Sequence, residues 1–150
     1  MFPDLSKFTE PDKLRKLLFN ARRLGHHDYA FEIHMRIAEL AGLPFEDALE
    51  REFWTAVSYA EEVKTEENGR TTRLLRTRQK HKRAGAIQCL VDWAVDPATT
   101  DGFAVLVEHG RPDLTGEAIV IRHADKFPAD AVAKAAAKLA AHGISREQLV

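Results

Sequence analysis

Apolar residues recur every three or four positions along most of this chain, which is the spacing of one face of an α-helix. The clearest example is residues 45–67, where acidic side chains occupy the opposite face. Its apolar stripe consists of Leu49, Phe53, Ala56, Ala60 and Val63. Asn68 and Gly69 follow, and glycine at this place is a common left-handed stop for a helix. We therefore predict a long helix that ends at about residue 67.

The same spacing predicts further helices on both sides of this one. Before it, two apolar-striped segments are separated by Gly25, which indicates a helical hairpin. After it, apolar positions return at residues 86–94 and in the alanine-rich stretch 128–141. The predicted fold class is all-α, with about seven or eight helices arranged as packed helical hairpins. At 150 residues the chain fits one helical domain, residues 1–150.

Residues 102–123 contain two short apolar runs that are rich in β-branched side chains. Periodicity cannot separate a buried strand from a buried helix at this length. The alternative fold class is therefore α+β, with a small hairpin at 102–123. We prefer helices because this region repeats the Gly, Asp and Glu spacing of the first hairpin, which suits a turn, a cap and a first-turn acid. The matching residues are Gly25, Asp28 and Glu32, and Gly110, Asp113 and Glu117.

Positive charge gathers in residues 70–83, which we call the basic segment and which contains no carboxylate. The formal net charge of the chain is −1, so everything outside the seven cations of this segment sums to −8 (−1 minus +7). The seven are Arg70, Arg73, Arg76, Arg78, Lys80, Lys82 and Arg83. No apolar residue occurs from Arg76 to Arg83, so a hydrophobic core cannot hold that stretch.

These seven cations are the candidate nucleic-acid-binding residues. Clustered arginine and lysine neutralise phosphates and release counterions, and the forked donors of arginine match phosphate oxygens. No aromatic residue interleaves the segment, so stacking on single-stranded bases is not indicated. Two other interpretations stay open. The segment can be solvated or fold back onto the acids of Glu61–Glu67, or it can bind an acidic protein partner.

No motif in the chain points to catalysis. The histidines at 26, 27 and 34 lack the spacing of a metal-binding helix, and Pro112-Asp113 is not followed by the Glu-x-Lys of a nuclease. We expect a small non-enzymatic helical protein with no catalytic residue, no metal and no cofactor, which binds nucleic-acid backbone through residues 70–83. The alternative is a helical protein–protein interaction adaptor, whose basic segment is a solvated or acid-paired face.

The remaining expectations concern location and assembly. No apolar run approaches the roughly 20 residues needed to span a bilayer, no secretory leader is visible, and the single cysteine, Cys89, agrees with a reducing compartment. We therefore expect a cytoplasmic protein without a membrane partner. A homodimer is a further expectation, because two-fold pairing would double the basic footprint.

Overall fold

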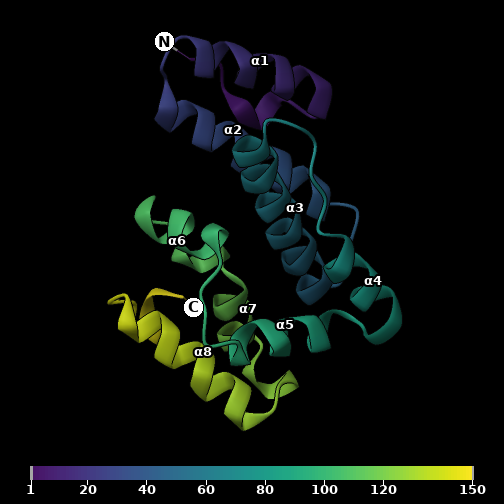
Figure 1. Ribbon diagram of the computed structural model, residues 1–150, viewed down its shortest axis with the longest axis vertical. Coiled ribbons are helices and arrows are strands. Elements are labelled where there is room, and N and C mark those ends of the chain that lie inside the picture. The colour runs from purple at the N-terminus through teal and green to yellow at the C-terminus, as the bar shows by residue number, and fades with distance from the viewer. Residues whose placement is uncertain (1, 150) are drawn as a thin grey trace.

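The computed structural model describes residues 2–149, without the side chain of Asp101, and this part of the chain holds eight α-helices and no β-strand (Figure 1). The all-α prediction is therefore confirmed. In the same residues, no helix combines the length and the apolar character that crossing a membrane requires. The helices are α1 (Pro11–Arg23), α2 (His27–Gly42), α3 (Ala48–Asn68), α4 (Leu75–Ala84), α5 (Ala86–Val95), α6 (Asp101–Glu108), α7 (Gly116–Arg122) and α8 (Ala129–Ala141). The same residues hold four short 3-10 turns: η1 (Leu5–Lys7) before α1, η2 (Pro112–Leu114) and η3 (Ala124–Lys126) on either side of α7, and η4 (Arg146–Gln148) after α8.

Helix α3 connects the two ends of the molecule (Figure 1). It begins at Asp47, whose carboxylate accepts a hydrogen bond of 3.0 Å from the amide of Glu50. It ends at Gly69, which adopts a left-handed φ of 68°, as the sequence predicted. Helix α2 packs along α3, α1 lies next to α2 near the C-terminal end of α3, and α5, α7 and α8 lie at the other end.

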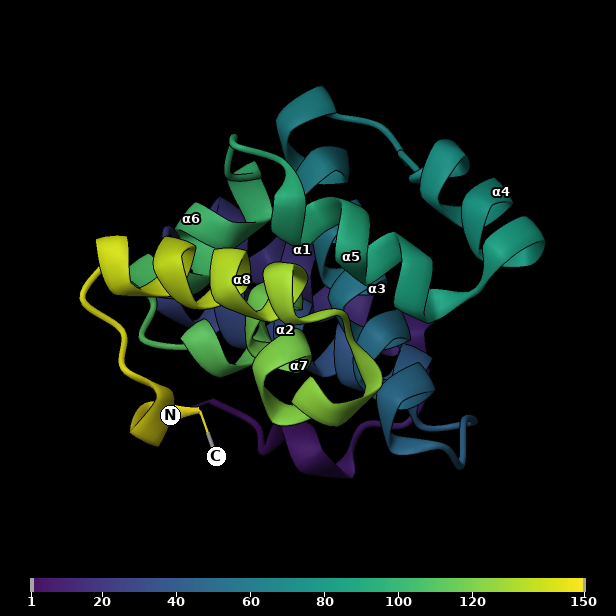
Figure 2. The ribbon, with the colours of Figure 1, turned by 90° about the horizontal axis from the view of Figure 1, so that it is seen from below.

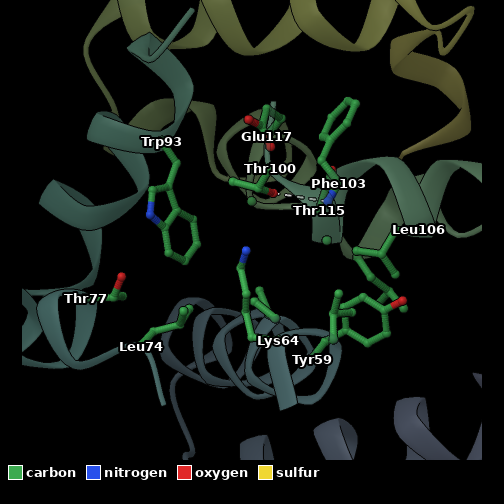
Figure 3. A pocket seen from close by; sticks show the side chains of 16 residues that line it. Tyr59, Lys64, Leu74, Thr77, Trp93, Thr100, Phe103, Leu106, Thr115 and Glu117 are labelled. Carbon is green, nitrogen blue, oxygen red and sulfur yellow. Dashed lines mark hydrogen bonds between the residues drawn. The ribbon is translucent and has the colours of Figure 1, made fainter. Parts of the chain in front are cut away.

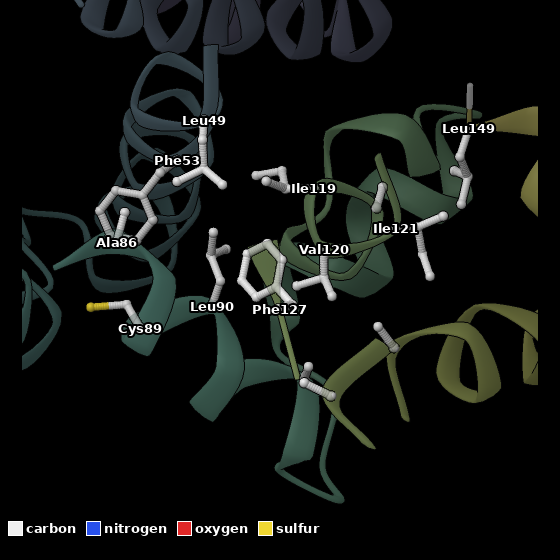
Figure 4. Packing of buried hydrophobic residues seen from close by; sticks show 14 of the residues in the cluster. Leu49, Phe53, Ala86, Cys89, Leu90, Ile119, Val120, Ile121, Phe127 and Leu149 are labelled. Carbon is white, nitrogen blue, oxygen red and sulfur yellow. The ribbon is translucent and has the colours of Figure 1, made fainter. Parts of the chain in front are cut away.

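The apolar stripe of α3 contributes to the largest of three buried clusters (Figure 4). Leu49 and Phe53 face Leu90 of α5, and Ile119 and Phe127 complete that layer. A second cluster fills the α1–α2 hairpin, and a third joins α2, α3 and α6. Because α3 contributes to two of these clusters, its side chains determine how the two ends of the molecule are placed.

The region 102–123 is helical, so the alternative of a β-hairpin is wrong. Two threonines cap the helices: Thr100 Oγ1 accepts from the amide of Phe103, and Thr115 Oγ1 accepts from the amide of Ala118. The glycine turn inside this region, at Gly110, has a φ of 72° and matches the 78° of Gly25. Helix α7 is buried on nearly every side, which explains why its sequence shows no helical stripe.

Helix α4 carries most of the basic segment and lies at the outer edge of the molecule, joined to α3 by an extended loop (Figure 2). None of its residues is buried. This agrees with the absence of apolar side chains from Arg76 to Arg83. Polar contacts must therefore hold α4 in place.

Candidate nucleic-acid interface

The basic segment opens with a loop that is tied to the end of α3. Thr65 Oγ1 accepts a hydrogen bond of 2.9 Å from the amide of Thr72. Two residues later, the amide of Leu74 donates to Glu61 Oε2 at 2.9 Å. Both acceptors are side chains of α3, so the loop follows a defined path along this helix before α4 begins.

Glu61 is the main anchor of the segment. Glu61 is 7% exposed, and its carboxylate accepts two hydrogen bonds of 2.7 Å from Arg78, one on each oxygen. Arg73 approaches the same carboxylate at 4.0 Å. The Arg78 guanidinium also lies 5.2 Å from the centre of the Trp54 ring. Its hydrogen bonds to Glu61 raise the pKa of Arg78, and burial reverses only part of that increase.

Two further contacts fix the inner side of α4. Lys80 forms an ion pair with Asp92 of α5. His81 Nε2 lies 3.0 Å from a carboxylate oxygen of Glu50, and its ring stacks on Phe53 with centroids 5.2 Å apart. Helix α4 is therefore attached to both α3 and α5 by charged or aromatic side chains.

Four cations of the segment point away from these anchors. Their side chains are exposed, and within residues 2–149 none of them forms an ion pair or a hydrogen bond. These residues, which we call the exposed cations, are Arg70, Arg76, Lys82 and Arg83. The other three, the anchored cations, are Arg73, Arg78 and Lys80. Within residues 2–149, the ion pairs of these seven cations involve two carboxylates, Glu61 and Asp92, so the cations outnumber the acids that they pair with by five.

The idea that the segment folds back onto Glu61–Glu67 is correct for Glu61 alone. Helical geometry turns the neighbouring acids toward other parts of the molecule, since residues three and four apart share a face. Their partners are Arg15 and His34 for Glu62, Arg22 and His34 for Glu66, and Lys64 for Glu67. Intramolecular pairing therefore explains the anchored cations and leaves the exposed cations unexplained.

The histidine region weighed as a metal site contains a buried ion-pair network instead. His34 is 6% exposed, and its ring has Nδ1 at 3.1 Å from Glu62 and Nε2 at 3.0 Å from Glu66. Arg15 adds hydrogen bonds of 3.0 and 3.3 Å to both oxygens of Glu62. No group of three or more His, Cys, Asp or Glu side chains in residues 2–149 is arranged to hold a metal ion. The network joins α1 and α2 to α3.

This network predicts a loss of stability in acid. Burial raises the pKa of Glu62, but the hydrogen bonds from His34 and Arg15 outweigh it and bring the pKa below the ordinary 4.5. A carboxylate with a lowered folded-state pKa stabilises the fold above its unfolded-state pKa, and this contribution is lost as the pH falls through the folded-state value. The variant Glu62→Gln should therefore be less stable than wild type at neutral pH, with a deficit that shrinks in acid. Denaturant unfolding at several pH values measures this. The same change at the exposed Glu67 should leave the pH profile unchanged, and a pH-independent deficit in Glu62→Gln would contradict the interpretation.

The carboxylates of the incomplete nuclease pattern lie in separate ion pairs. Asp113 pairs with Arg111 at 3.1 Å, and Glu117 pairs with Lys138 at 3.3 Å. Lys138 also donates to the carbonyl of Trp93 at 2.6 Å. The two carboxylates are therefore engaged in two separate ion pairs with different cations.

A cavity of about 200 Å³ lies where α3, α5 and α6 meet (Figure 3). Trp93, Phe103 and Leu106 form apolar parts of its wall, and the ammonium of Lys64 points toward its centre. Thr77 of the basic segment also lines it. The cavity therefore lies behind the start of α4, away from the exposed cations.

Sequence reasoning missed the residues that position α4. Glu50 and Trp54 are four apart on α3, and Trp54 Nε1 donates to Glu50 at 3.0 Å, a pairing that their helical spacing could have suggested. Asp92 lies twelve positions beyond Lys80, and no local pattern connects the two.

A search of protein-family models, of curated proteins and of solved structures finds no match for this chain.

Proposed function

We propose that this chain is a non-enzymatic protein that binds the phosphate backbone of nucleic acid through its exposed cations. The observation that supports this is the division of the basic segment. Arg78 and Lys80 hold α4 in place, and Arg73 approaches Glu61 from the loop before it. By contrast, Arg70, Arg76, Lys82 and Arg83 face solvent without a carboxylate partner in residues 2–149. Positive charges in excess of their acidic partners repel one another, and a polyanion relieves that repulsion.

The position of α4 suits such a partner. The helix lies at the outer edge of the molecule, so a long polyanion can approach it without meeting the other helices (Figure 2). Arg76 and Arg83 are two helical turns apart, about 10 Å along the axis. Successive phosphates of a DNA strand rise by about 3.4 Å, so the two arginines span about three of them. The contacts are to the backbone, which predicts weak sequence preference.

Fluorescence anisotropy of a labelled DNA duplex tests this proposal. We expect binding at low salt and a steep loss of affinity as salt is added. For the four exposed cations, raising the salt from about 50 to 200 mM should lower the affinity by about a hundredfold, because each phosphate contact contributes about 0.9 to the logarithmic slope. Absence of binding at the lower salt concentration would refute the proposal.

A second candidate function is a protein-interaction adaptor for an acidic partner. Two exposed apolar side chains favour it: Leu75, 63% exposed, and Ile87, 41% exposed, lie at the starts of α4 and α5. Phosphate backbone offers these side chains no apolar contact, whereas a protein surface does. The changes Leu75→Ser and Ile87→Ser should then weaken capture of an acidic protein while leaving the affinity for DNA unchanged.

A further inference from the structure

A groove of about 650 Å³ runs along α3 on the inner side of the basic segment. One side of it is formed by Arg15 of α1 and by residues from the second half of α2, and the other by the loop that carries Arg73. Trp54, Ser58 and Thr65 line it from α3. Arg73 and Arg78 line this groove as well, so it borders the basic segment on the side of its anchored cations.

Two aromatic rings lie in this groove. Phe45 and Trp54 are stacked, with centroids 5.8 Å apart and planes inclined by 15°. Both side chains are half-buried, so part of each remains accessible. The sequence had argued against stacking because no aromatic residue interleaves residues 70–83. The fold changes this, since it brings the aromatic pair from before and within α3 to the basic segment.

The groove also carries donors for phosphate. Arg15 and Arg73 lie at its rim with side chains 49% and 59% exposed. Hydroxyl groups of Ser58, Thr71 and Thr72 complete the polar lining. Arg15 and Arg73 also pair with the two acids of the groove, Glu62 and Glu61, and Arg78 is the third arginine of the lining. Three arginines thus face two acids, which leaves the groove with a net positive charge for a phosphate.

We infer that this groove binds an unpaired nucleotide, so that the preferred ligand of the chain is nucleic acid with a single-stranded segment. A base extends the Phe45–Trp54 stack, and Arg15 and Arg73 bind the phosphates that flank it. Stacking tolerates any base because every base has a π-face, so this agrees with weak sequence preference. The inference rests on the proposed function, because the exposed cations would bind the rest of the strand.

Tryptophan fluorescence gives a direct test, because the chain has two tryptophans and only Trp54 lies in the groove, whereas Trp93 lines the cavity behind α4. In the variant Trp93→Phe, an oligothymidylate of about 12 nucleotides should quench the emission of Trp54. In Trp54→Phe, the emission of Trp93 should not change under the same conditions. Unchanged Trp54 emission at saturating oligonucleotide would overturn the inference.

A matched pair of phenylalanine variants provides the second measurement. Phe45→Leu should weaken binding of the oligothymidylate by about fivefold or more, the effect of losing one base stack, and should leave binding of a blunt duplex unchanged. Phe19→Leu, at an exposed position of α1 that does not line the groove, should change neither affinity. Equal loss for duplex and single strand would contradict base stacking.

If polyglutamate quenches Trp54 and the oligonucleotide does not, the groove serves an acidic protein and the inference is wrong. Duplex binding without any Trp54 response leaves the proposed backbone function intact, whereas absence of binding to either nucleic acid refutes both.

Discussion

Replacing the four exposed cations with alanine is expected to lower the affinity for duplex DNA by about a hundredfold or more at moderate salt, because each lost phosphate contact removes the release of nearly one counterion. The variant changes Arg70, Arg76, Lys82 and Arg83 together. Their side chains are exposed and unpaired within residues 2–149, so the free energy of unfolding should stay within about 0.5 kcal/mol of wild type. Anisotropy titration and denaturant unfolding measure the two quantities on the same sample.

Net charge alone could mimic this result, so the chain needs a control with an equal loss of positive charge elsewhere. Four exposed cations without an ion-pair partner in residues 2–149 serve this purpose on α1, η3 and α8: Lys16, Arg23, Lys126 and Lys134. Their joint replacement by alanine should change the affinity for DNA only slightly. An equal loss in both quadruple variants would mean that the chain attracts DNA through its overall charge and not through the basic segment.

Removing the carboxylate of Glu61 is expected to lower the free energy of unfolding by about 2–3 kcal/mol. The change Glu61→Ala leaves Arg78 without its bidentate partner and the amide of Leu74 without its acceptor. Breaking a fully buried pair costs more, but the Arg78 side chain is 34% exposed and water recovers part of the loss. Denaturant unfolding measures the effect. Amide hydrogen exchange should also show faster opening of α4, because no buried residue holds that helix.

The matched control for this prediction is Glu67→Ala. Glu67 is half-exposed and pairs with Lys64, at 3.6 Å on the same helix. Its loss should therefore change the free energy of unfolding by less than about 0.5 kcal/mol. If Glu61→Ala is equally mild and the amides of α4 keep their protection, α4 is held by something other than its polar anchors.

The helices with a one-sided apolar stripe could be predicted from sequence, and the fully buried one could not. Helix α3 shows both its stripe and its glycine stop in the sequence, and both are confirmed. Helix α7 packs Ala118, Ile119, Val120 and Ile121 against neighbours in several directions. A continuous apolar run of this kind is compatible with a buried helix and with a buried strand. The first residue of α7 could have been predicted from the sequence, because a threonine such as Thr115 commonly caps a helix.

The cations of the candidate site were evident from sequence, but their division into two groups was not. Glu61 and Glu62 both belong to the polar face predicted for α3, yet both are buried, one toward α4 and the other toward His34. Which acid meets which cation depends on the direction in which α4 returns along α3, and charge patterns do not encode that direction. The position of Trp54 also depends on this direction, since it packs against the largest buried cluster and lies 5.2 Å from the Arg78 guanidinium.

The salt dependence of DNA binding, compared between wild type and the quadruple variant of the exposed cations, tests the division of the basic segment most directly. The slope of the logarithm of affinity against the logarithm of salt concentration counts the phosphates that the protein neutralises. We expect the wild-type slope to be steeper by about 3 to 4 than that of the variant, since each removed contact lowers it by about 0.9. Equal slopes in the two proteins would show that Arg70, Arg76, Lys82 and Arg83 do not touch the phosphate backbone.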